Sequence, residues 1–105
     1  MKVLREKVGS SKNRFREMRA FDFEETSYNG YTNVIYGEDV VVSFNDDMII
    51  LKNSNEFNDE NKLALNFISD DYDLGYTVYA KYPNWEVSVG TFSILFRNGM
   101  DISRR

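Results

Sequence analysis

The stretch that decides the fold is VVVSFNDDMIILK, residues 40–52. It contains two apolar runs, Val40–Phe44 and Met48–Lys52, separated by Asn45-Asp46-Asp47. Asn and Asp favour turns because their side chains hydrogen-bond to nearby backbone, so this spacing predicts a β-hairpin. Both runs are apolar on both faces, which is typical of strands in the centre of a sheet that is covered on both sides.

On the N-terminal side of this hairpin, Thr32–Tyr36 is rich in β-branched and aromatic residues and predicts a further strand before Gly37. Residues 15–25 leave two alternatives open. Ser11 could cap a helix over residues 12–20, or Phe21 and Phe23 could alternate with acidic residues in a strand.

On the C-terminal side, Lys62–Ser69 fits two patterns. Leu63, Leu65 and Phe67 alternate as in a strand. Leu63 with Phe67 and Leu65 with Ile68 also suit helical spacing. We favour a strand for this segment.

A second hairpin is predicted from Gly75–Tyr82 and Trp85–Phe96, with Pro83 at the second position of a type I turn. In the return strand, apolar residues occupy odd positions up to Val89 and even positions from Phe92 onward. A strand's side chains alternate between its faces, so this change of parity predicts a β-bulge or sharp bend at Gly90.

These segments predict a mainly β fold, with α+β as the alternative. We expect one domain: residues 1–19 form a basic arm or short helix, and residues 20–105 form an acidic domain. The domain is expected to be a single antiparallel sheet of about five or six strands, strongly twisted or curled into a half-barrel.

Charge is unevenly distributed along the chain. Residues 1–19 carry seven basic side chains and two acidic ones, whereas residues 20–96 carry three lysines and fourteen carboxylates. Within the arm, the basic residues interleaved with Phe15 are Lys12, Arg14, Arg16 and Arg19. This distribution leaves three hypotheses for the arm: it lies across the acidic sheet, it contacts nucleic acid, or it binds an acidic protein surface.

The chain contains no cysteine and no histidine. This composition excludes disulfides, thiolate nucleophiles and Cys-based zinc sites, and it removes the usual proton shuttle near neutral pH. The carboxylates of residues 69–75 do not fit a calcium loop, because Gly75 stands one residue too late. We therefore expect no catalytic, cofactor or metal site; the alternative is a hydrolase that uses carboxylates alone. No apolar run is long enough to span a membrane, and no apolar block marks a signal peptide, so we expect a soluble, cytoplasmic protein.

Acidic and aromatic residues near predicted turns are the candidates for binding a partner protein. The acidic candidates are Asp46, Asp47, Asp70, Asp71 and Asp73. The aromatic candidates are Tyr28, Tyr31, Tyr72 and Tyr79. Exposed tyrosine is favoured at interfaces because it combines a large area with a polar tip.

A short chain rich in Asn, Asp, Tyr and Ile, without His or Cys, resembles small accessory proteins of phages from low-GC bacteria. Anti-CRISPR and anti-restriction inhibitors are members of this loose class. The resemblance covers the composition of the whole chain and assigns no residue. It implies a non-catalytic inhibitor, acting in the host cell cytoplasm, that occupies the basic surface of a larger partner such as a nucleic-acid-binding enzyme. The alternatives are a nucleic-acid-binding protein that uses the arm, and a structural homo-oligomer.

Overall fold

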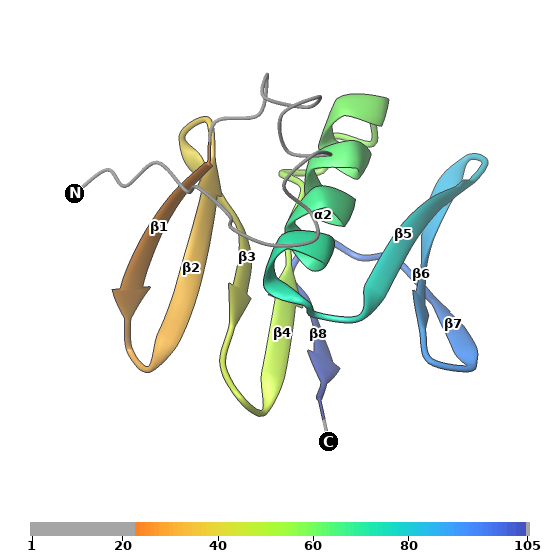
Figure 1. Cartoon of the computed structure of the whole chain (residues 1–105). Coiled ribbons are helices and arrows are strands. Elements are labelled where there is room, and N and C mark those ends of the chain that lie inside the picture. The colour runs from red at the N-terminus through yellow and green to blue at the C-terminus, as the bar shows by residue number, and fades with distance from the viewer. Residues whose placement is uncertain (1–22, 105) are drawn as a thin grey trace.

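The computed structural model describes residues 23–104, which form eight strands and one helix. The elements are β1 (Phe23–Tyr28), β2 (Tyr31–Tyr36), β3 (Asp39–Phe44), β4 (Met48–Leu51), α2 (Asp59–Tyr72), β5 (Tyr76–Lys81), β6 (Asn84–Val89), β7 (Phe92–Leu95) and β8 (Met100–Ser103). Figure 1 shows α2 standing between two groups of strands. The arm predicted at residues 1–19, with its alternative helix, lies outside the described residues.

The first group is a five-stranded antiparallel sheet in the order β1-β2-β3-β4-β8. The hairpin predicted from residues 40–52 is confirmed, since β3 pairs with β4. The β1–β2 turn is Asn29-Gly30, in which both residues have positive φ angles of 55° and 79°. Such turns match the twist of the strands they join, and Asn and Gly tolerate this backbone conformation best.

The second group is a three-stranded antiparallel sheet in the order β5-β6-β7. The hairpin predicted around Pro83 is confirmed, but its turn is not type I. Tyr82 and Pro83 form the whole two-residue connection between β5 and β6, and the peptide bond between them is cis.

The fold is therefore mainly β and antiparallel, as predicted, but the single sheet is wrong. The long strand predicted for residues 85–96 is also wrong. Gly90 has a positive φ of 59° and, with Thr91, reverses the chain, so residues 92–95 return as β7. After a two-residue turn, the inward-facing side chains shift from odd to even positions, as they would after a bulge.

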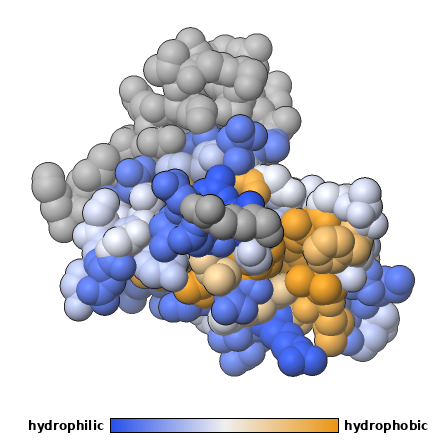
Figure 2. Space-filling view, turned by 90° about the horizontal axis from the view of Figure 1, so that it is seen from below, coloured by the Kyte–Doolittle hydropathy of each residue, from blue (hydrophilic) through white to orange (hydrophobic). Residues whose placement is uncertain are grey.

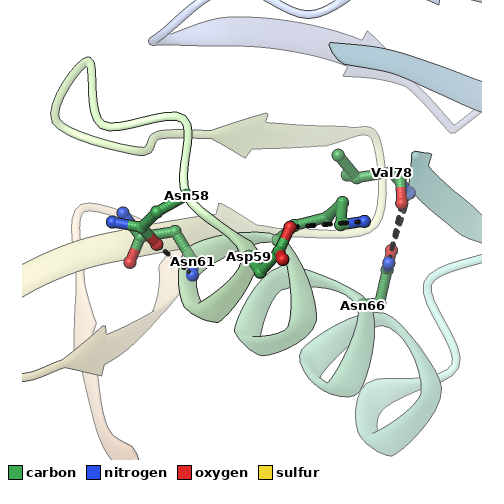
Figure 3. Close-up of polar contacts among 6 residues, drawn as sticks. Asn58, Asp59, Asn61, Asn66 and Val78 are labelled. Carbon is green, nitrogen blue, oxygen red and sulfur yellow. Dashed lines mark hydrogen bonds and ion pairs between the residues drawn. The ribbon is translucent and has the colours of Figure 1, made fainter. Parts of the chain in front are cut away.

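The one helix among the described residues, α2, lies in the middle of the chain and occupies the segment predicted as a strand. Asn58 caps it: its side-chain oxygen accepts a hydrogen bond from the amide of Asn61 at 2.8 Å (Figure 3). Acidic residues follow in the first turn, where they complement the helix dipole. Leu63, which suggested alternation, is 46% exposed, and the buried face instead follows helical spacing through Leu65 and Ile68.

One hydrophobic core joins the helix to both sheets. Phe67 of α2 stacks on Phe23 of β1 with 5.9 Å between ring centroids. Trp85 of β6 contacts Phe96 edge to face at 5.1 Å, and Phe57, which precedes the helix, lies against both rings. The core therefore lies on the inner side of each sheet, around α2.

The helix also completes the outer edge of β5. The side-chain amide of Asn66 donates to the carbonyl of Val78 at 2.7 Å and accepts from the amide of Val78 at 2.6 Å (Figure 3). The hydroxyl of Ser69 donates to the carbonyl of Tyr76 and accepts from its amide. These side chains satisfy backbone groups that would otherwise need a neighbouring strand.

Candidate functional site

One end of the five-stranded sheet collects turns from distant parts of the sequence. The register pairs Tyr28 with Tyr31, Thr32 with Phe44, and Met48 with Ser103. The β1–β2 turn, the β3–β4 turn and the end of β8 therefore lie at the same end of the sheet, as Figure 1 shows.

The C-terminal end of α2 lies at this end as well. Tyr72 packs against Phe44 at the end of β3, with ring centroids 5.2 Å apart. Its hydroxyl donates to Oε1 of Glu25 in β1 at 2.5 Å. Through these contacts the C-terminal end of α2, which carries Asp70 and Asp73, lies against β1 and β3. We call this surface, formed by residues 28–31, 44–48 and 70–73, the acidic end.

Four of the five acidic candidates are exposed at the acidic end, namely Asp46, Asp47, Asp70 and Asp73. The fifth, Asp71, is only 1% exposed. It follows Phe67 and Ile68 at helical spacing, on the face of α2 that is buried. Asp71 is therefore buried, and we leave it out of the exposed acidic set.

Asn45 holds the turn between β3 and β4. The side-chain oxygen of Asn45 accepts hydrogen bonds from the amides of Asp47 and Met48, at 2.8 and 2.9 Å. Arg104 then donates through its guanidinium to the carbonyl of Asn45 at 2.7 Å. The side chain of Asn45 therefore holds this turn through two backbone amides.

The helix dipole disfavours the aspartates at the end of α2. The carbonyl end of a helix carries partial negative charge, so basic residues are favoured in the last turn. The last turn of α2 contains no basic residue, and Asp70 and Asp73 flank its end. Residues 23–104 as a whole carry fourteen carboxylates and five cations, a net charge of −9.

Three of the four tyrosine candidates lie at the acidic end. Tyr28 is 72% exposed at the end of β1, while Tyr31 and Tyr72 are half-buried. Tyr79 lies elsewhere, on the outer face of the three-stranded sheet. Its hydroxyl donates to Glu86 Oε1 at 2.9 Å and lies 2.8 Å from Ser93 Oγ. The basic candidates Lys12, Arg14, Arg16 and Arg19 lie outside the described residues.

Within residues 23–104, no group of three or more acidic side chains is placed to hold a metal ion. Burial raises the pKa of Tyr76, whose hydroxyl donates to the carbonyl of Leu65 inside the core. Across the same residues, no helix has the length and apolar character that crossing a membrane requires.

β7 carries an apolar surface that was not predicted from the sequence. Phe92, Ile94 and Leu95 are 59%, 36% and 47% exposed. An open cleft of about 550 Å³ lies beside the strand, lined by Ile94, Leu95, Arg97 and Met100 among others. Figure 2 looks onto the end of the molecule that carries the turns: hydrophilic residues cover the side of the five-stranded sheet, and hydrophobic ones gather mainly on the other side. The sequence feature that indicates this surface is the absence of any charged side chain from residues 90–96.

Comparison of the chain with protein-family models, with curated proteins and with solved structures finds no match.

Proposed function

We propose that the protein is a non-catalytic binding protein that uses its acidic end to occupy a basic surface on a larger protein. The partner class that fits best is an enzyme with a positively charged, anion-binding channel, such as a nucleic-acid-binding enzyme. Bound there, the protein would act as an inhibitor by excluding the natural ligand.

One observation carries this proposal: three separate segments bring four exposed aspartates and an exposed tyrosine, Tyr28, to one end of the molecule. At the end of α2 the helix dipole disfavours carboxylates, and in the β3–β4 turn Asn45 accepts the amide hydrogen bonds of Asp47 and Met48. Exposed carboxylates that separate segments bring to one end of a molecule are good candidates for binding a basic partner.

The physical role of the two residue types differs. Carboxylates at the rim of an interface mainly accelerate association with a basic partner, and salt weakens this effect. Tyrosine supplies buried contact area once the complex has formed, since its ring is large and has few rotatable bonds. The proposal therefore requires binding whose association rate falls steeply as salt rises. The compositional resemblance to phage-encoded inhibitors favours the same class of function.

Two matched variants test the proposal. The first replaces the exposed aspartates of the acidic end: Asp46→Asn, Asp47→Asn, Asp70→Asn and Asp73→Asn. The second replaces exposed acidic residues that lie elsewhere: Glu38→Gln, Asp39→Asn, Glu56→Gln and Asp59→Asn. Both sets change the net charge equally, so any difference between them reports on position rather than on total charge.

The intact protein and both variants are used to recover partners from cells of the native host, and association rates are then measured on the recovered partner. We expect the first variant to associate about tenfold more slowly at low salt, and the second to resemble the intact protein. Equal loss in both variants would show that overall charge, not the acidic end, is responsible. Unchanged association in the first variant would refute the proposal.

A further inference from the structure

Among the described residues, four strands lie at sheet edges, and three of these edges are protected. β1 carries Glu24 and Glu25, and β8 carries Asp101. The edge of β5 is covered by Asn66 and Ser69 of α2. Charges and covering elements are the usual means by which proteins prevent strand edges from pairing with other chains.

The fourth edge, β7, has neither protection. Residues 90–96 contain no charge and no proline, and within residues 23–104 the strand pairs with β6 alone. The amide of Phe96 donates to the carbonyl of Trp85 at 3.0 Å, so Ile94, two residues earlier, also directs its backbone groups toward β6. The backbone groups of Ser93 and Leu95 therefore point away from the sheet.

The side chains of β7 extend the inner apolar face past the region that α2 covers. Phe92 stands opposite Val89, and Ile94 stands opposite Val87, whose side chain is fully buried. Side chains on directly opposed residues of an antiparallel pair point to the same side of the sheet. Phe92 and Ile94 thus continue the core side of the sheet while remaining partly exposed.

We propose that β7 pairs with β7 of a second copy of this chain, antiparallel and about a two-fold axis at Ser93. In this register Ser93 opposes the partner's Ser93, and Phe92 opposes the partner's Ile94. The outward backbone groups of Ser93 then meet those of the partner's Ser93, and Leu95 lies opposite the partner's turn residue Thr91. The two three-stranded sheets become one sheet of six strands.

The distribution of charge favours a second copy of the chain as the partner of this edge. The full chain carries a net charge of −4, and residues 23–104 carry −9, so two copies repel one another overall. Near β7 the charges balance: Lys81 pairs with Glu86 at 3.7 Å, and Arg97 and Asp101 both line the cleft. An uncharged strand flanked by balanced charges can meet its own copy without this repulsion. A basic partner would find no excess of negative charge near β7, whereas the acidic end offers one.

The absence of cysteine from the chain allows a direct test of the register. A Ser93→Cys variant places two thiols opposite one another in a hydrogen-bonded pair, where Cα atoms lie about 5.5 Å apart. This separation suits a disulfide. Thr77→Cys is the matched control, because Thr77 is exposed and lies in the same row across the sheet, opposite Ser88, which in turn opposes Ser93.

We expect mild oxidation to convert Ser93→Cys almost completely to a disulfide-linked dimer and to leave Thr77→Cys largely uncrosslinked. Sedimentation velocity of the intact protein should show a concentration-dependent dimer. Ile94→Lys, which places a charge in the exposed edge, should sediment as a monomer, whereas Thr77→Lys should still dimerise.

An intact protein that stays monomeric at every concentration would overturn the proposal. Equal crosslinking of the two cysteine variants would overturn the register, since it would indicate random collisions. Because these measurements need no partner protein, they stand apart from the test of the acidic end.

Discussion

The hydroxyl of Tyr76 in β5 donates a hydrogen bond to the backbone carbonyl of Leu65 in α2, with 2.7 Å between the oxygens. Both residues are buried, so the bond fixes the helix against the three-stranded sheet from within the core. Burial opposes ionisation of the phenol and raises its pKa above the ordinary value of 10.0.

The raised pKa of Tyr76 predicts alkaline destabilisation. Below pH 10, Tyr76 is protonated in both the folded and unfolded states and contributes no pH dependence. Above pH 10, the unfolded state loses this proton while the folded state retains it, so the free energy of unfolding falls as pH rises.

Urea unfolding of the intact protein and of Tyr76→Phe, measured from about pH 8 to pH 11.5, tests this prediction. At pH 8 the variant should be less stable by about 1 kcal/mol because it lacks the hydrogen bond. Above pH 10 the gap should close, since phenylalanine does not titrate. Parallel pH profiles for the two proteins would contradict the assignment.

Removing the side chain that covers the β5 edge should weaken the fold. Asn66→Ala leaves the amide and carbonyl of Val78 without their side-chain partner, and we expect the free energy of unfolding to fall by about 1–3 kcal/mol. Asn84→Ala is the control, since Asn84 is exposed at the start of β6. Similar losses in both variants, measured by urea denaturation, would argue against an edge-covering role.

Asn98 should hold the loop that follows β4. Its side-chain oxygen accepts hydrogen bonds from the amides of Asn53 and Ser54 at 2.8 and 3.2 Å, and Ser54 and Asn55 both adopt positive φ angles. Asn98→Ala should accelerate hydrogen exchange at both amides. Asn98→Asp retains an oxygen acceptor and should preserve most of their protection; equal exchange in the two variants would show that the acceptor is unimportant.

One residue of the acidic end, Asp73, should lower the free energy of unfolding. Asp73 ends α2 in the left-handed conformation with a φ of 57°, and its carboxylate lies at the negative end of the helix dipole. Asn tolerates this conformation equally well and is neutral. We expect Asp73→Asn to raise the free energy of unfolding by about 0.3–1 kcal/mol, less at high salt. A loss of stability in thermal or urea unfolding would mean that the carboxylate has a structural role.

The sequence predicted those parts of the fold that depend on neighbours along the chain. The β3–β4 hairpin could be read from residues 40–52 because Asn45 itself forms the turn's side-chain contacts. The same holds for the hairpin around Pro83, although not for its turn type. In both, the residues that determine the structure lie between the strands they join.

The remaining features depend on contacts between distant segments. A parity change at Gly90 fits a bulge and a two-residue turn equally well, and only the pairing of β6 with β7 distinguishes them. Leu63, Leu65 and Phe67 alternate by accident, because Leu63 faces solvent on a helix. The capping pattern of Asn58 with the acidic residues that follow it was the stronger local signal.

The candidate surface was predicted in part for the same reason. Composition identified the aspartates as candidates, but their convergence depends on strand order and on where α2 ends. Asp71 could not be separated from Asp70 and Asp73 until helical spacing showed which of them faces inward.

The position of β8 has a consequence for how the chain folds. Most neighbouring strands are joined by short turns, but β8 pairs with β4, and all of residues 52–99 lie between them. Closing so long a segment costs chain entropy that the local hairpins do not incur, and pairing between distant segments slows folding. We therefore expect the hairpins to form early and the junction of β4 with β8 to form late, as the rate-limiting step that commits both sheets to a common core.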